Sequence, residues 1–300
     1  MNISLIDVDS HNFPNLALMK ISAWHKAHGD TVDWYSPLFS SPDKIYASKV
    51  FTFTPDYLDY NPCHPQPIRG GTGYDIASKI PDEVDAMQPD YTIYPQYDHA
   101  IGFLSRGCIR NCNFCLVRKK EGYIRQYSDI EQVAQGRKMV VLMDNNFLAN
   151  DPDFVRDQLE KSVCLNLKID FNQGLDCRLI NEDNAQWLAK CTWGIVTGSN
   201  IYIRFSCDHN EMIEPCKRAI STMRKAGFTG KFFVYLLAKD PVETLDRLKQ
   251  VLEIDEKVNP FVMPFRDFGD GKIKDPELKR LARWCNMVSI RKSCSFEEYR

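Results

Sequence analysis

The 300-residue sequence lacks the features that mark several classes of protein. No stretch approaches the roughly 18 apolar residues that a transmembrane helix needs. The first thirteen residues have neither the basic segment nor the long apolar core of a signal peptide. Low-complexity tracts and internal repeats are also missing, and 44% hydrophobic with 26% charged residues is ordinary for a globular chain. The sequence therefore predicts a cytoplasmic globular protein, with no membrane partner and room for one large domain or two ordinary ones.

A surplus of positive charge is missing as well. Lysine and arginine number 38 against 40 aspartate and glutamate residues, for a net charge of -2. This balance disfavours a globally basic nucleic-acid binder. One short segment is nevertheless basic, which leaves nucleic acid open as a partner, because such a group suits either phosphates and carboxylates or a solvated loop. Its members are Arg106, Arg110, Arg118, Lys119, Lys120 and Arg125.

Cysteine, in contrast, is abundant, with eleven residues. A chain without an export signal keeps its thiols reduced, so clustered cysteines indicate metal binding or catalysis before disulfides. Three of them, Cys108, Cys112 and Cys115, form the pattern C-x3-C-x2-C. A [4Fe–4S] cluster normally takes four thiolates, so three would leave one iron open to a ligand. A structural zinc site usually shows two spaced pairs of ligands, and the next cysteine here is Cys164.

The amino-terminal segment predicts alternating strands and helices. An amphipathic helix is expected between Pro14 and Gly29, because Pro suits a first helical turn and Gly a helix end. Strands are expected at Ile3–Val8, Thr31–Tyr35, Lys49–Phe53 and Ile68–Gly71. This alternation predicts an α/β domain with a doubly wound parallel sheet over residues 1–91.

A second βα series begins near residue 92. Its strands are predicted at 100–104, 139–144, 167–172, 201–206, 231–237 and 259–263. Its helices are predicted near 128–137, 152–161, 183–189, 211–226 and 241–253. Six units are too few for a closed eight-fold barrel and favour a partial (β/α)6 barrel over residues 92–265. Residues 266–300 then form a carboxy-terminal extension with one helix from Pro276 to Trp284.

The cysteine triad, with Phe114 directly before its last member, resembles that of the radical S-adenosylmethionine (SAM) superfamily. The triad also stands where this family places it, in a loop after the first strand of a partial barrel. The resemblance covers residues 92–265. It implies that Cys108, Cys112 and Cys115 bind three irons of a [4Fe–4S] cluster, while the fourth iron binds SAM. Reductive cleavage of SAM would then give a 5′-deoxyadenosyl radical that abstracts hydrogen from a substrate. Phe114 would lie beside the cluster near the adenine.

The same resemblance implies further SAM contacts. Asp144, Asn145 and Asn146 stand where family members place groups against the SAM amino group, although a polar turn that caps a helix would look the same. Arg204 and Ser206, inside the fourth strand, would meet the ribose or carboxylate. A buried arginine needs an anionic partner, so a structural carboxylate is an equal alternative for Arg204. The third strand adds polar residues expected at the barrel mouth, namely Asp170, Asn172, Gln173, Asp176 and Arg178.

The amino-terminal segment resembles the cobalamin-binding-type Rossmann domain that precedes many of these barrels. Asp9 and His11 match two positions of the D-x-H-x-x-G motif, but Pro14 replaces its glycine. Cobalamin is therefore not expected, and a cobalamin-dependent methyltransferase is the alternative enzyme. A methylthiotransferase is disfavoured, since it needs three further cysteines in this domain and only Cys63 is present. A non-catalytic metal-binding protein is the alternative outside enzymes. The resemblance also implies an electron donor such as flavodoxin or ferredoxin as a partner.

Overall fold

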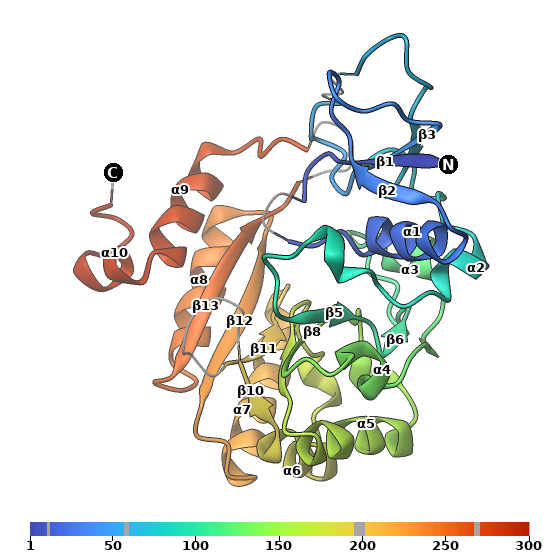
Figure 1. Cartoon of the computed structure of the whole chain (residues 1–300). Coiled ribbons are helices and arrows are strands. Elements are labelled where there is room, and N and C mark those ends of the chain that lie inside the picture. Colours follow the sequence, from blue (N-terminus) through green and yellow to red (C-terminus); the bar gives the residue numbers. More distant parts are fainter. Residues whose placement is uncertain (11–12, 57–59, 195–201, 267–270, 300) are drawn as a thin grey trace. The chain divides into compact units, whose positions relative to one another are not determined.

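The computed structural model describes residues 1–10, 13–56, 60–194, 202–266 and 271–299 (Figure 1). Its contacts divide the chain into two compact units. The amino-terminal unit comprises Met1–Asp98 with Asp267–Lys272, and the carboxy-terminal unit comprises His99–Arg266 with Ile273–Arg300. Most of residues 266–300, which the sequence predicted as a carboxy-terminal extension, thus belong to the second unit. Across the described part of the chain, no helix has both the length and the apolarity that a membrane crossing requires.

The amino-terminal unit is built on a four-stranded sheet in which every neighbouring pair is parallel, in the order β2-β1-β3-β4. The strands are β1 (Asn2–Asp7), β2 (Thr31–Trp34), β3 (Lys44–Ser48) and β4 (Ile68–Gly70). Helix α1 (Leu16–Ala27) begins at Asn15, whose side chain accepts a hydrogen bond from the Leu18 amide. Two short elements follow, α2 (Asp82–Asp85) and η1 (Tyr91–Ile93). The predicted parallel α/β sheet is confirmed.

The third strand lies earlier than the sequence predicted. The apolar run from Lys49 to Phe53 is not a strand, because β3 ends at Ser48. The amides of Val50 and Phe51 both donate to the carboxylate of Asp9, each at 2.9 Å, and so cannot continue the ladder. Between consecutive strands of this sheet, α1 is the sole helix in the described residues. The connections therefore lack the regular helices of a doubly wound sheet.

The carboxy-terminal unit holds two parallel sheets, ordered β10-β9-β8-β5 and β11-β12-β13. Their strands are β5 (Ala100–Gly102), β8 (Met139–Leu142), β9 (Lys168–Phe171), β10 (Thr192–Trp193), β11 (Tyr202–Ser206), β12 (Lys231–Ala238) and β13 (Val258–Pro264). A parallel bridge between Leu175 and Phe205 joins the two sheets. The six predicted strands are present, although position 201 lies outside the described residues. The sequence did not predict β10.

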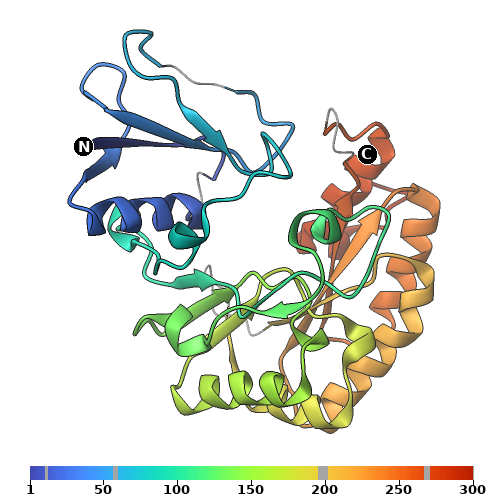
Figure 2. The same ribbon diagram turned by 90° about the vertical axis from the view of Figure 1, so that its right-hand side faces the viewer.

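Helices cover one face of these strands (Figure 2). They are α4 (Ile130–Ala134), α5 (Pro152–Cys164), α6 (Glu182–Lys190), α7 (Ile213–Lys225), α8 (Pro241–Leu252) and α9 (Pro276–Asn286), and α10 (Val288–Ser293) packs against α9. Strand β12 shows the consequence, since Phe232, Val234 and Leu236 are fully buried while the alternating side chains are half-buried. The half-buried face carries Arg204 and Tyr235, so these two polar side chains of β11 and β12 share one side.

The core of this unit depends on a buried aromatic cluster. Phe171 is 1% exposed and stacks on Phe147 with ring centroids 4.8 Å apart. We expect Phe171→Ala to lower the free energy of unfolding by about 3–5 kcal/mol, because it removes a buried ring and leaves a cavity. Val242→Ala, at a side chain that is 78% exposed in the same unit, should change it by less than about 0.5 kcal/mol. Urea unfolding of the two variants makes the comparison, and equal losses would contradict this packing.

Candidate functional site

The three cysteines lie in a loop, residues 107–124, that is closed at its base (here called the cysteine loop). Strands β6 (Ser105–Arg106) and β7 (Arg125–Gln126) pair antiparallel on either side of it, and α3 (Val117–Glu121) lies within it. Arg106 makes a two-point ion pair with Glu121, with Nε–Oε2 at 2.9 Å and Nη2–Oε1 at 2.6 Å. The guanidinium of Arg106 also lies over the Phe103 ring, 4.1 Å from its centroid. These contacts hold both ends of the loop together.

Gly107 allows the chain to turn into the first cysteine. Its φ is +85°, in the left-handed region that favours glycine. A Cβ atom at this position would stand 2.2 Å from the carbonyl oxygen of Tyr123. The following amide, of Cys108, donates to the carbonyl of Gly122 at 3.3 Å. Only glycine therefore permits the two sides of the loop to approach this closely.

The three thiols are neighbours within the loop. Burial raises the pKa of Cys115, and the charges of Cys112 and Cys108 raise it further. Burial likewise raises the pKa of Cys112, whereas the positive charge of the nearby Arg178 lowers it in part. Backbone N–H groups point at the sulfurs: the Arg110 amide lies 3.3 Å from Cys108 Sγ and the Val117 amide 3.5 Å from Cys115 Sγ. Such amides favour the thiolate form that binds metals.

A metal-containing group fits this donor set by its chemistry. Soft sulfur ligands on one loop, with amides directed at two of them, suit iron–sulfur clusters and zinc. In the described part of the chain, no three histidine, cysteine, aspartate or glutamate side chains are already arranged around a common metal position. The thiols would therefore adjust their side-chain torsions on binding.

Asp144 follows strand β8 and ties the loop to the sheet. Its carboxylate accepts hydrogen bonds from the Leu104 amide (3.0 Å), the Ser105 amide (2.6 Å) and the Ser105 hydroxyl (2.7 Å). Asp144 is 2% exposed, and burial raises its pKa to about 6. The sequence predicted a contact with SAM for this residue, whereas here it binds the residues that lead into the cysteine loop.

Asn145 and Asn146, which follow Asp144 in the chain, each carry a buried side-chain oxygen. The Oδ1 atoms of both are buried without a hydrogen-bond partner among the described residues. Asn146 is 3% exposed, and its Nδ2 lies 3.5 Å from Cys108 Sγ and 3.4 Å from Asp176 Oδ2. A buried amide oxygen without a partner is costly, so each of these two atoms is open to a hydrogen-bond donor.

Most of the basic residues around the cysteines have protein partners. Arg110 pairs with Asp176 at 3.0 Å, and Arg118 Nη1 donates to the Cys108 carbonyl at 3.2 Å. Arg125 Nη1 donates to the Glu121 carbonyl at 2.7 Å. Together with the pairing of Arg106, these contacts show that much of the positive charge holds the loop.

Two residues that the sequence analysis did not single out also face the loop. Asp208 follows strand β11, where burial raises its pKa, and its charge raises the pKa of Cys112 and Cys115. Lys239 follows strand β12, and its ammonium lies 5.0 Å from the ring centroid of Phe114. Both could have been found from the rule that ligands gather beyond the carboxyl ends of parallel strands, since each stands two residues after a predicted strand.

Arg204 is paired within the sheet. Its Nε and Nη2 contact the two carboxylate oxygens of Asp170 at 2.6 and 2.8 Å, and Nη1 donates to the Tyr235 hydroxyl at 3.2 Å. The structure therefore supplies the carboxylate partner that the sequence analysis held open. Ser206 lies two residues further along β11, and its carbonyl accepts a bond from the Cys177 thiol at 3.5 Å. Contacts of Arg204 and Ser206 with SAM stay predictions.

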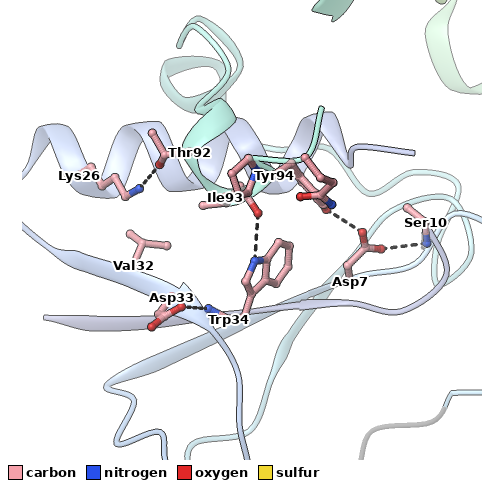
Figure 3. Close-up of a pocket in the computed structure, with 11 residues that line it drawn as sticks. Asp7, Ser10, Lys26, Val32, Asp33, Trp34, Thr92, Ile93 and Tyr94 are labelled. Carbon is pink, nitrogen blue, oxygen red and sulfur yellow. Dashed lines mark hydrogen bonds between the residues drawn. The ribbon is translucent and has the colours of Figure 1, made fainter. Parts of the chain in front are cut away.

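The amino-terminal unit has a hollow of its own, of about 570 Å³ (Figure 3). Trp34 donates its indole N–H to the Ile93 carbonyl at 3.0 Å, and Tyr94 donates its hydroxyl to Asp7 at 2.6 Å. The close-up shows these bonds bracing β1 and β2 against the segment around η1. Of the cobalamin-type motif, Asp9 binds the backbone amides already described, and His11 lies outside the described residues.

Comparisons with known proteins give distant likenesses. No family model and no curated protein matches the chain. A crystal structure of Streptococcus suis SuiB bound to precursor peptide SuiA is similar with a TM-score of 0.47 and 14% identity, over 64% of this chain and 46% of that one. A crystal structure of HydG, a maturase of the [FeFe]-hydrogenase, gives 0.40 and 15%, over 66% and 53%. This chain thus spans about half of each, and neither likeness decides its function.

The glycine that precedes Cys108 provides one test of the loop geometry. Gly107→Ala should destabilise the protein more than Gly136→Ala, where φ is +77° but no atom lies within 4 Å of the added Cβ. The second change should cost only the left-handed conformation, about 1–2 kcal/mol. The first must also displace the Tyr123 backbone. Urea unfolding measures both, and equal costs would argue against the close approach.

A second test concerns the buried carboxylate of Asp144. Its pKa in the folded chain, about 6, lies above the ordinary value of 3.8, so the folded state binds the proton more tightly. This contribution is full below about pH 4 and is lost as the pH rises through 6. Relative to Asp144→Asn, the wild-type free energy of unfolding should fall by up to about 3 kcal/mol across that window. Unfolding curves at several pH values measure it, and a constant or rising difference would contradict this account.

Proposed function

We propose that this chain is a radical SAM enzyme. Cys108, Cys112 and Cys115 hold three irons of a [4Fe–4S] cluster, and SAM binds the fourth. When bound and reduced, the cluster supplies the electron that cleaves SAM into methionine and a 5′-deoxyadenosyl radical, which takes a hydrogen atom from the substrate. The protein contributes the binding, orientation and shielding of these groups.

The observation that carries the proposal is the grouping of three thiols in one closed loop beside the end of a parallel sheet. The loop contains no fourth cysteine, so a cluster bound here would keep an iron for another ligand. Ligands of parallel α/β sheets gather outside the carboxyl ends of the strands. Residues that follow three different strands gather here. Asn146 lies next to Cys108, Asp176 pairs with Arg110 of the loop, and the charge of Asp208 acts on Cys112. A partial barrel opening at this edge agrees with the strand order.

Among the predicted SAM contacts, Asn145 and Asn146 are the best supported. Their buried oxygens need a donor, and the ammonium group of SAM would provide one. Asp144 instead binds Leu104 and Ser105, which lead into the loop, and Arg204 is paired with Asp170. Phe114 stays assigned to the adenine side of the cluster, where Lys239 approaches its ring.

The proposal includes an electron donor such as flavodoxin or ferredoxin, since cleavage of SAM consumes one electron.

The proposal does not include cobalamin. The Asp9 carboxylate accepts two backbone amides at the end of β3, which supports a structural role for this residue. A cobalamin-dependent methyltransferase is the alternative, and one equivalent of corrinoid retained after desalting would favour it.

Replacement of the cysteines tests the proposal. Anaerobically reconstituted protein should contain about four irons per chain. With dithionite it should convert SAM into 5′-deoxyadenosine. The iron–sulfur cluster should also absorb visible light. This absorption and the activity should both be lost in Cys108→Ala, Cys112→Ala and Cys115→Ala, because each change removes a cluster ligand. Iron analysis and chromatography of the nucleoside products measure the two effects.

Two other thiols serve as controls. Cys164 is exposed in the same unit and Cys63 is exposed in the amino-terminal unit. Cys164→Ala and Cys63→Ala should keep both cluster and activity. Stoichiometric zinc without visible absorption in the wild type would instead support a non-catalytic metal-binding protein.

A further inference from the structure

Asp176 forms the centre of a buried polar network beside the cysteine loop. It follows strand β9, caps the short helix η3 (Cys177–Leu179), and its side chain is 6% exposed. Oδ1 accepts bonds from the Arg178 amide (3.1 Å) and Arg178 Nε (2.7 Å). Oδ2 accepts bonds from Arg178 Nη2 (3.0 Å), Arg110 Nε (3.0 Å) and Asn146 Nδ2 (3.4 Å). One carboxylate thus joins three separate segments.

Two of these partners lead directly to the cysteines. Arg110 lies between Cys108 and Cys112, and its own amide points at Cys108 Sγ. Asn146 places its Nδ2 against the same sulfur at 3.5 Å. The side chains of Arg110 and Arg178 are 33% and 29% exposed, so the pairing covers a carboxylate that would otherwise be buried alone.

We propose that Asp176 is a positioning residue for the iron–sulfur cluster, which holds the cysteine loop in its binding conformation through Arg110 and Asn146. The proposal rests on the function proposed above for what the loop binds. It concerns a residue that touches neither iron nor SAM and that acts through its neighbours. Partners of this outer kind fix the orientation of ligands and commonly change metal affinity 10–100-fold when removed.

The change Asp176→Asn tests this with little change of shape. The amide keeps one oxygen, which can still accept the Arg178 backbone N–H. The NH2 group of the new asparagine only donates hydrogen bonds, but it would face the donor groups of Arg110, Arg178 or Asn146. These donors would then lose the acceptor that the Asp176 carboxylate provides. The loop should therefore loosen while the strands stay folded.

A matched control lies at the opposite end of the strands. Asp255 precedes β13, accepts the Lys257 amide at 2.8 Å, and makes a two-point pair with Arg224 at 2.8 Å on each side. Asp255→Asn breaks an equivalent arrangement away from the carboxyl ends of the strands. It reports what the loss of a partly buried aspartate–arginine pair does to stability in general.

Two measurements compare the variants. In the iron-free 300-residue chain, hydrogen exchange of amides 107–117 should be at least about tenfold faster in Asp176→Asn than in wild type, and unchanged in Asp255→Asn. In the reconstituted protein, ferrozine should extract iron about tenfold faster or more from Asp176→Asn. Arg110→Gln should produce much of the same effect, and the double variant should add little, because both residues act in one pair.

The outcomes separate the two proposals. Equal exchange and equal iron release in Asp176→Asn, Asp255→Asn and wild type would overturn the role of Asp176 while leaving the cluster in place. Additive effects of Asp176→Asn and Arg110→Gln would overturn the route through Arg110. A wild-type chain that takes up no cluster would refute the proposed function, and hydrogen exchange in the iron-free chain would still decide whether Asp176 orders the loop.

Discussion

The cysteine loop depends on the buried carboxylate of Asp144. Asp144 stands just beyond β8, and its two oxygens accept the backbone N–H groups of Leu104 and Ser105, where the chain leaves β5 and enters β6. Each of these amides would cost about 1–3 kcal/mol if it were buried without an acceptor. The bonds therefore fix the direction in which the loop departs from the sheet. Ser105 also begins the antiparallel pair β6–β7, so the residue that Asp144 binds is part of the base that closes the loop.

The parallel alignment of the strands then determines which residues surround the loop. Parallel strands place their carboxyl ends at one edge, so side chains far apart in the sequence become neighbours. Asn146 meets Cys108, and Asp176 meets Arg110, although at least thirty residues separate the members of each pair. Burial disfavours ionisation of Asp176, yet its bonds to Arg178 and Arg110 hold its pKa below the ordinary range. A charged, bonded carboxylate thus persists beside the thiols.

The sequence predicted the parts of this arrangement that are local. The spacing of Cys108, Cys112 and Cys115 is a property of the chain itself. The apolar runs of the strands in the carboxy-terminal unit are continuous in the sequence. Both can therefore be recognised before the fold is known. The strand expected at Lys49–Phe53 was wrong because a distant residue, Asp9, takes the amides that a strand would use. The partner of Arg204 and the network of Asp176 were hidden for the same reason. Each depends on which side chains meet across strands, and that is decided by tertiary register.

Electron paramagnetic resonance of the dithionite-reduced, reconstituted protein tests the central claim most directly. Three cysteine ligands would leave one iron of a [4Fe–4S] cluster open, and that iron is the proposed binding position of SAM. The reduced protein should show the signal of a paramagnetic [4Fe–4S] cluster, and addition of SAM should change the shape of that signal because its ligation changes. A cluster signal that SAM leaves unaltered, or a protein that contains zinc and gives no signal, would contradict the claim.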